Sequence, residues 1–363
     1  MKRSYKHLAL ATIAGLLALP AVAAADTISP DTFSKTLAVG ESYTLRKTVT
    51  IQKGGTTTAK VDVMFLFDTT GSMGGLINSA KSNAGVILSG LSSYGDLGYA
   101  VADYRDFPIG SFGYTGDYPY SMKQNITTNA AATATSINSL SIGNGADYPE
   151  ANLYALQHAA TDTTWRADTN RFVVWFGDAQ GHTSSDAGYP AGVTVANSIS
   201  ALQAKNVKVE AINMAGYAGG GIDGAGQASQ IASQTGGTLQ NTTNASAIVS
   251  LISSAITTSF ATYSDVSLGT SGLDGNVGVT YAPVSYTGSF DRSEDRTFTF
   301  DVTFTGLAAG TDEFYVNALV DRGSVAREFD RITVTDSVPE PATMLLMGTG
   351  LAGLIGARRR KKA

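Results

Sequence analysis

The strongest constraint on the fold is an apolar run, VDVMFLF at residues 61–67, that ends directly on Asp68. Six of its seven side chains are apolar, as in a parallel strand that is covered on both faces. Apolar residues then recur at spacings of three and four from Met73 to Leu91, which predicts a long amphipathic helix. Because such strands and helices alternate to about residue 260, the sequence predicts a doubly wound, Rossmann-like α/β domain over residues 61–261.

The flanking segments follow a different pattern, in which apolar and polar residues alternate. DRTFTFDVTFTG places Phe298 and Phe300 on one face, and such segments predict an antiparallel β-sandwich over residues 262–336. ESYTLRKTVTI alternates in the same way, with Lys47 breaking the series. Because residues 26–60 are too few to fold alone, we expect them to add strands to the sandwich. The α/β domain would then be inserted in it, and two separate β segments are the alternative.

Residues 1–25 have the order of a secretory signal peptide. Lys2, Arg3 and Lys6 precede an apolar run at residues 8–19, and small residues follow it. A membrane-spanning helix needs about 20 apolar residues, so this run is too short for an anchor. We therefore expect the chain to be exported and this segment to be removed by signal peptidase.

Residues 338–363 carry a second targeting pattern. Residues 342–357 are uncharged and mostly apolar, and five basic residues follow at 358–362. As a helix, the apolar stretch would span slightly less than the hydrocarbon core of a bilayer. A plain C-terminal anchor is one interpretation. However, VPEP at residues 338–341, the short apolar stretch and the arginine cluster together resemble the PEP-CTERM sorting signal.

That resemblance implies an exported protein of a Gram-negative bacterium. Its tail would insert transiently in the membrane and be processed by an exosortase. The expected location of the protein is then the cell envelope, the cell surface or the extracellular matrix.

Charge and composition limit the partners. The formal net charge is −5, and the two terminal segments carry eight basic residues and one acidic residue, so the chain without them has a charge of −12. We expect no binding to nucleic acid or to an anionic membrane surface, whereas cations can bind. The chain has no cysteine and therefore no disulfide. Without thiolates, and with only His158 and His182 outside the terminal segments, a zinc site of the usual kind is not expected.

Four acidic residues lie where the predicted elements meet one edge of the sheet. Asp68 and Asp178 each follow a buried strand, and Asp147 and Glu150 lie at the start of a predicted helix. Ligands bind at the carboxyl ends of strands in open α/β sheets. Because converging carboxylates repel one another unless a cation lies among them, the pattern predicts a cation site. Carboxylate and hydroxyl oxygens favour Mg²⁺, Mn²⁺ or Ca²⁺ over softer metals.

The same residues carry a resemblance to the von Willebrand factor A (vWA) domain family, and within it to the integrin β type. DTTGS at residues 68–72 is similar to the metal-ion-dependent adhesion site (MIDAS) motif Asp-x-Ser-x-Ser, with threonine at the first serine. DYPE at residues 147–150 matches an Asp-x-Pro-Glu element, and FGDA at residues 176–179 matches a strand that ends in Asp-Ala. The integrin β domain is also housed in a β-sandwich.

The resemblance implies one divalent cation, with Mg²⁺ placed before Mn²⁺ and Ca²⁺. The residues implied to hold it, directly or through water, are Asp68, Thr70, Ser72, Glu150 and, in an outer position, Asp178. One coordination position stays open in such a site, and a carboxylate of a protein or polymer ligand can fill it. The implied function is cation-dependent adhesion or interaction, without catalysis.

Two departures from the integrin pattern concern neighbouring cation sites. Gly74 and Gly75 replace the acidic pair that follows the motif, so we expect the adjacent calcium site to be missing. Gly145 replaces the asparagine ahead of the Asp-x-Pro-Glu element. Asp147 is the remaining candidate ligand for a secondary metal on that side, and Asp106 is another. A surface or helix-capping role is the alternative for Asp106.

The segment YRDFPIGSFGYTGDYPY, residues 104–120, is a candidate specificity loop at the same edge. Its tyrosines combine a large contact area with a polar tip, as in many binding surfaces. They are Tyr104, Tyr114, Tyr118 and Tyr120. An ordinary packed and partly exposed loop is the alternative.

Two other functions compete with adhesion. DTTGS also resembles the motif of aspartyl-phosphate enzymes, in which the first aspartate is the nucleophile. That phosphohydrolase-like chemistry needs a second acidic pair, and the position four after Asp178 is His182. The other alternative is a structural spacer with an unused metal site. Because no Gly-x-Ser-x-Gly elbow accompanies the histidines, a hydrolase triad is not expected, and we predict that the protein is not an enzyme.

Overall fold

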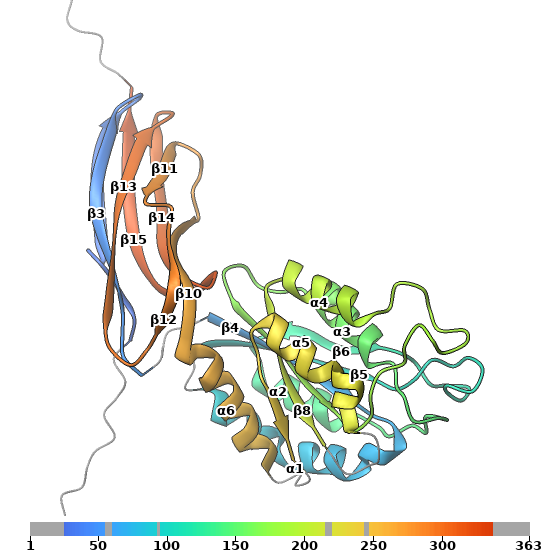
Figure 1. The fold of residues 1–363 in the computed structure, drawn as a ribbon. Helices are drawn as coiled ribbons and strands as arrows, with labels where there is room; N and C mark the ends of the chain where they lie inside the picture. The colour runs from blue at the N-terminus through green and yellow to red at the C-terminus, as the bar shows by residue number, and fades with distance from the viewer. Residues whose placement is uncertain (1–24, 55–59, 93–94, 215–219, 243–246, 337–363) are drawn as a thin grey trace, which may run out of the picture.

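The protein folds as an α/β unit beside a β-sandwich (Figure 1). A computed structural model describes residues 25–54, 60–92, 95–214, 220–242 and 247–336. Nearly all of the predicted signal peptide and the apolar C-terminal stretch at residues 342–357 lie outside these ranges. Within them, no helix is long and apolar enough to cross a membrane.

The α/β unit is built on a six-stranded sheet of order β6-β5-β4-β7-β8-β9. Neighbouring strands are parallel except for β5 and β6, which are antiparallel. The strands are β4 (Lys60–Asp68), β5 (Asp96–Tyr104), β6 (Ser121–Thr127), β7 (Asn170–Gly177), β8 (Val207–Asn213) and β9 (Leu239–Asn241). Strand β4 is buried along almost its whole length, as its apolar run predicts.

Helices cover both faces of this sheet and explain that burial. The helices are α1 (Gly74–Leu91), α2 (Ala130–Asn138), α3 (Asn152–Asp162), α4 (Val195–Ala204), α5 (Gln227–Thr235) and α6 (Ile248–Ala261), with the 3₁₀ turns η1 (Gly71–Met73) and η3 (Gly221–Gly226). One apolar core joins α1, α2 and α6 to the sheet, and a second joins α3, α4 and α5 to the opposite face. The predicted α/β class is therefore confirmed.

The sandwich combines strands from before and after the α/β unit. One sheet has the order β1-β3-β13-β11 and the other β12-β10-β14-β15-β2. The strands are β1 (Thr27–Ser29), β2 (Thr32–Ala38), β3 (Ser42–Ile51), β10 (Thr262–Ser271), β11 (Val277–Ala282), β12 (Ser285–Asp291), β13 (Arg296–Gly306), β14 (Gly310–Val320) and β15 (Gly323–Thr335). Strand β3 pairs antiparallel with β13, so residues far apart in sequence share one core.

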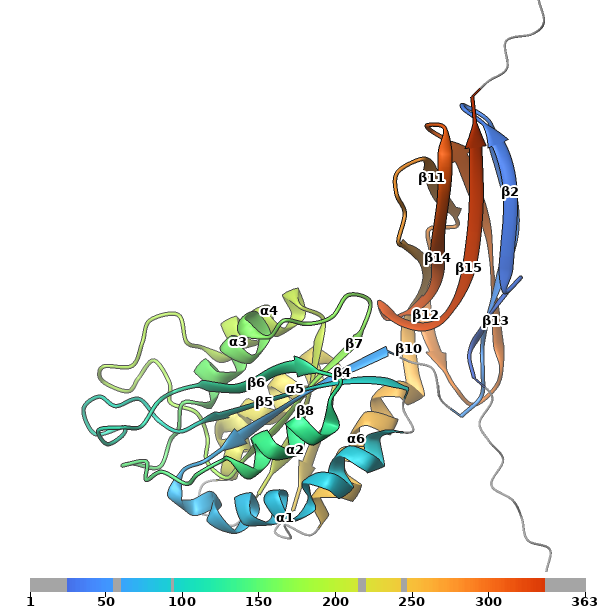
Figure 2. The same ribbon diagram turned by 180° about the vertical axis from the view of Figure 1, so that it is seen from behind.

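One pair departs from the predicted antiparallel pattern, because β2 runs parallel to β15 (Figure 2). No hairpin connects these two strands, since almost the whole described chain lies between them. Their relative direction is therefore not set by a tight turn.

The sandwich meets the α/β unit at the start of β15. The Ser324 backbone N–H donates a hydrogen bond to the Asp168 carbonyl oxygen at 2.8 Å. A Cβ atom on Gly323 would collide with the side-chain amide of Asn170, the first residue of β7, so a larger residue at 323 would require that side chain to move. The sandwich thus contacts the amino ends of the central strands, and their carboxyl ends point away from it (Figure 2).

Candidate metal centre

The candidate site lies where the order of the central sheet reverses. From β4 the chain continues to β5 on one side and later returns to β7 on the other. Asp68 is the last residue of β4, and Asp178 directly follows β7. Since β4 and β7 are adjacent and parallel, both carboxylates lie at the carboxyl edge of the sheet, at the switch point where ligands bind in such folds.

Two hydroxyl groups connect these carboxylates. The backbone N–H and the hydroxyl of Thr70 donate to Asp68 Oδ1 at 2.8 and 2.6 Å. The Thr70 and Ser72 hydroxyl oxygens lie 3.5 Å apart, and Ser72 Oγ donates to Asp178 Oδ1 at 3.0 Å. Asp68 and Thr70 are buried, whereas Ser72 is exposed, so the group opens to solvent at Ser72.

Glu150 is the fifth predicted ligand, and the structure brings it to the same place. Its backbone N–H donates to the Gln180 carbonyl, which ties the start of α3 to the loop after β7. Its side chain is buried, and Oε2 has no hydrogen-bond partner among the described residues. The same is true of Asp68 Oδ2. Two unpaired, buried carboxylate oxygens beside two hydroxyls form a donor set that fits a hard divalent cation.

The electrostatics of this group also fit a cation. Burial raises the pKa of Asp68 to about 7. Burial and then the charge of Asp68 raise the pKa of Glu150 to about 11. Burial likewise raises the pKa of Asp178. Without a cation, the group therefore retains protons at neutral pH, because three negative charges cannot share one buried space.

The Gly145 position, where integrins carry asparagine, borders this site directly. Gly145 has φ of +65°, a conformation that favours glycine. A Cβ atom there would lie 3.2 Å from both Glu150 Oε1 and Thr70 Cγ2. The glycine therefore leaves space for the Glu150 carboxyl group.

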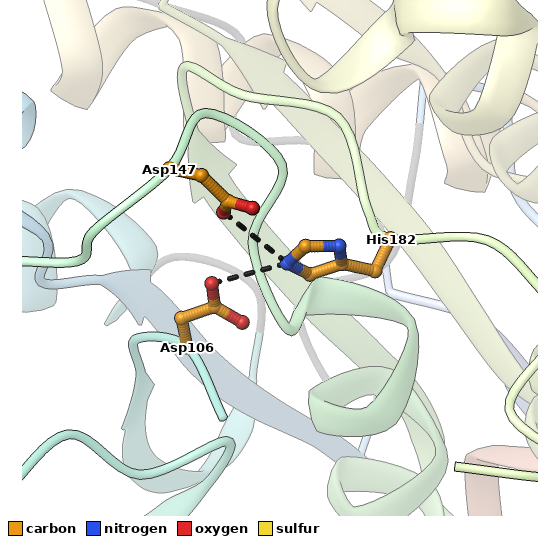
Figure 3. A group of neighbouring side chains, drawn as sticks. All are labelled: Asp106, Asp147 and His182. Atoms are coloured by element: carbon orange, nitrogen blue, oxygen red, sulfur yellow. Dashed lines mark hydrogen bonds and ion pairs between the residues drawn. The ribbon is translucent and has the colours of Figure 1, made fainter. Parts of the chain in front are cut away.

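A second group of side chains contains both predicted secondary ligands (Figure 3). It is close enough to the first group that the charge of Asp106 acts on Asp68 and Glu150. His182 Nε2 is 3.1 Å from Asp106 Oδ2 and 3.4 Å from Asp147 Oδ1. The three ligand atoms lie within 4.8 Å of one another. Asp106 and His182 are buried, and Asp147 is exposed, so this group also reaches the surface.

The sequence interpretation did not include His182 among the metal ligands. The available signal was its position four residues after Asp178, in a loop at the carboxyl edge. Its other ring nitrogen, Nδ1, lies 3.2 Å from Asp186 Oδ2. Burial disfavours the charged imidazole, but Asp106, Asp147 and Asp186 together outweigh this effect and raise the pKa of His182. Burial raises the pKa of Asp147 to about 6.

The tyrosine prediction needs one correction. Tyr104 is the last residue of β5 and is fully buried, so it cannot contact a ligand as predicted. Its hydroxyl accepts from Trp175 Nε1 at 2.9 Å within the core. Tyr114 is 56% exposed, whereas Tyr118 and Tyr120 are half-buried. The physical reason is that β5 extends one residue further than the loop boundary assumed from the sequence.

The C-terminus matches a known family. Residues 337–361 match the model of the PEP-CTERM protein-sorting motif. The protein carries a PEP-CTERM signal. The prediction for this segment is thereby confirmed, and the PEP-CTERM signal indicates export to the cell envelope or surface of a Gram-negative bacterium.

Three solved structures match this chain at low sequence identity and with TM-scores below 0.5. A von Willebrand factor type A protein from Catenulispora acidiphila has 14% identity over 85% of this chain and 72% of its own, with a TM-score of 0.41. BatB from Bacteroides thetaiotaomicron has 15% identity over 55% of this chain and 98% of its own, with a TM-score of 0.38. The pilus adhesin SpaC from Lactobacillus rhamnosus GG has 10% identity over 81% of this chain and 45% of its own, with a TM-score of 0.38. No curated protein matches this chain.

Proposed function

We propose that this exported protein is an interaction module that binds a protein or polymer ligand through a divalent cation. The residues proposed to hold the cation are Asp68, Thr70, Ser72, Glu150 and, through water, Asp178. The observation that carries the proposal is the pair of unpaired, buried oxygens, Asp68 Oδ2 and Glu150 Oε2, at the switch point of the sheet. The cation is Mg²⁺ in the first place, with Mn²⁺ and Ca²⁺ as alternatives.

The donor set suits binding of a ligand rather than a chemical step. Thr70 and Ser72 contribute neutral hydroxyls, so the charge of a bound cation is only partly neutralised and the cation can bind a further negative ligand. The exposed Ser72 marks the side from which a carboxylate of the partner would approach. Tyr114, exposed in the neighbouring loop, is the proposed aromatic contact, and the half-buried Tyr118 and Tyr120 are secondary candidates.

Replacement of Thr70 tests the role of its hydroxyl. We expect Thr70→Ser to bind Mg²⁺ as the wild type does, because it restores the serine of the MIDAS pattern. Thr70→Val keeps the shape but removes the hydroxyl, and we expect its affinity to fall about 10–100-fold in calorimetric titration.

The neighbouring Thr69 provides a matched control. It is equally buried, and its hydroxyl donates to Asp103 Oδ2 and the Tyr104 carbonyl, away from the site. Thr69→Val should therefore keep the Mg²⁺ affinity of the wild type. Equal losses in Thr69→Val and Thr70→Val would contradict a specific role for Thr70.

We also propose that Asp106 and Asp147, together with His182, hold a second cation. When His182 Nδ1–H donates to Asp186, the Nε2 lone pair faces the two carboxylates, and a cation among them removes the repulsion. The 3.1 and 3.4 Å spacings are close to the roughly 3.3 Å between ligands bound at about 2.0–2.1 Å in a tetrahedron. A nitrogen donor makes this site more favourable for Mn²⁺ or Zn²⁺ than the all-oxygen site.

Replacement of each of two histidines by alanine tests this second site. We expect the wild type to bind two Mn²⁺ ions and His182→Ala to bind one, as measured by equilibrium dialysis with metal analysis. His158→Ala is the matched control, because His158 pairs with Asp162 at 2.8 Å on the surface of α3. Unchanged stoichiometry in His182→Ala would rule out this assignment.

The two alternatives have direct tests. The charges of Asp178 and Asp106, which help to raise the pKa of Asp68, are both negative, whereas phosphoryl transfer needs cationic groups at the nucleophile. Incubation with phosphoryl donors followed by mass spectrometry would reveal a covalent phosphate on Asp68 and favour the enzyme. Failure to bind Mg²⁺, Mn²⁺ or Ca²⁺ would favour the spacer.

A further inference from the structure

The sandwich core contains a lysine that faces two acidic side chains. Lys47, on β3, is fully buried, and its Nζ atom donates to Asp330 Oδ1 and Oδ2 at 3.2 and 3.0 Å. The same Nζ atom is in direct contact with Glu328 Oε1. Glu328 and Asp330 are two residues apart on β15 and therefore point to the same face. The contact joins the two sheets of the sandwich, because β3 and β15 belong to different sheets.

The surroundings of this group are apolar. The rings of Phe33 and Phe304 lie 5.9 and 5.7 Å from Lys47 Nζ. Apart from its contact with Lys47, neither oxygen of Glu328 has a hydrogen-bond partner among the described residues. If all three groups were ionised, one ammonium and two carboxylates would leave one uncompensated negative charge in the core. Burying such a charge is energetically unfavourable, so a simple network of ion pairs does not account for this group.

The pKa shifts of Lys47 and Asp330 favour their neutral forms instead. Burial lowers the pKa of Lys47, although Asp330 partly opposes this. Burial also raises the pKa of Asp330, against the effect of Lys47. A neutral amine has the lone pair that a nucleophile needs, and a carboxyl group beside it can accept and return a proton.

We propose that Lys47 and Glu328 form an intramolecular isopeptide bond, assisted by Asp330. The Nζ lone pair of Lys47 attacks Cδ of the protonated Glu328 carboxyl group. Asp330 takes a proton from Nζ and delivers a proton to the departing hydroxyl. The C–O bond breaks as the N–C bond forms, and one water molecule leaves. No oxidant or further reactant is needed, and the fold supplies the proximity that makes such a step effectively unimolecular.

The proposed bond would link the two sheets of the sandwich covalently. The chain is exported and has no cysteine, so it has no disulfide to join its sheets. A bond between β3 and β15 would join strands that precede and follow the α/β unit, and would enclose that unit in a covalent loop. Closing so long a loop restricts the unfolded chain strongly.

Peptide mapping of the purified full chain tests the proposal. After denaturation and trypsin digestion, we expect residues 47–53 joined to residues 328–331, lighter than the two free peptides by one water molecule. Cleavage after Lys47 should be lost, because the amide removes its charge. Recovery of the free 48–53 and 328–331 peptides alone would overturn the proposal and leave a non-covalent cluster.

Variants separate the chemistry from folding. Glu328→Gln should release ammonia instead of water and yield a linked peptide of the same mass as the wild type. Glu328→Met, of similar size but without a carbonyl, should give no linked peptide. Lys35→Arg, on the neighbouring strand β2, should keep the bond, whereas Lys47→Arg should lose it. Fragment ions that place the bond on Asp330 would overturn the assignment of Glu328.

Discussion

Asp68→Asn is expected to lose saturable Mg²⁺ binding, with an affinity about 100-fold or more below that of the wild type, since removal of even an outer partner costs about 10–100-fold. The variant keeps the size of the side chain but removes the charge from a buried position that has one unpaired oxygen. Calorimetric titration with Mg²⁺, Mn²⁺ and Ca²⁺ measures the loss directly.

Asp62→Asn is the control for this experiment. Asp62 lies in the same strand β4 and is equally buried, but it pairs with Arg166 at the opposite end of the strand. We expect Asp62→Asn to reduce stability and to leave Mg²⁺ affinity unchanged. If Asp68→Asn binds Mg²⁺ as tightly as Asp62→Asn does, the proposed cation site is wrong.

The free energy of unfolding of the cation-free protein is expected to fall as the pH rises from about 4 to about 7. Asp68 ionises near pH 4 in the unfolded chain but near pH 7 in the folded protein, so the folded state binds more protons in this interval. The stability that this proton provides is complete below pH 4 and lost by pH 7. The contribution of Asp68 to the free energy of unfolding is at most about 4 kcal/mol, for a pKa shift of about three units. Glu150 extends the decline towards pH 11.

Urea unfolding in the presence of a chelator measures this dependence. The slope between pH 5 and pH 7 should be shallower in Asp68→Asn. The difference reports on Asp68 together with its effect on Glu150, because Asp147 and His182 shift in the same direction in both proteins. Added Mg²⁺ should restore stability at pH 7 in the wild type only, since the cation binds the ionised carboxylates. Identical slopes in the two proteins would contradict the raised pKa of Asp68.

Local patterns in the sequence predict much of the fold and the proximity of four of the five proposed ligands. VDVMFLF predicts a strand buried on both faces, and residues 68–72 are close in sequence, so their proximity follows from a single turn. Asp178 was predictable because it follows a second buried strand, and parallel strands end at one edge.

Other features depend on contacts that no local pattern contains. Lys47 looked like a break in an alternating strand, whereas it continues the inward face and meets Glu328 and Asp330 from the far end of the chain. His182 was missed for the same reason, because its partner Asp106 comes from a separate loop. Tyr104 was assigned to a loop because the sequence does not mark where β5 ends.

Strand β15 also defines a mechanical path through the molecule. Its first residues contact the α/β unit, and its last residues lie at the opposite end of the sandwich, directly before the sorting motif at residue 337 (Figure 1). Tension between a bound ligand and a C-terminal attachment would run along the length of this strand. The hydrogen bonds to β14 and β2 would then be loaded together in shear, instead of opening one after another as in an unzipping hairpin. The sandwich would act as a stiff tether that holds the cation edge of the α/β unit away from the point of attachment.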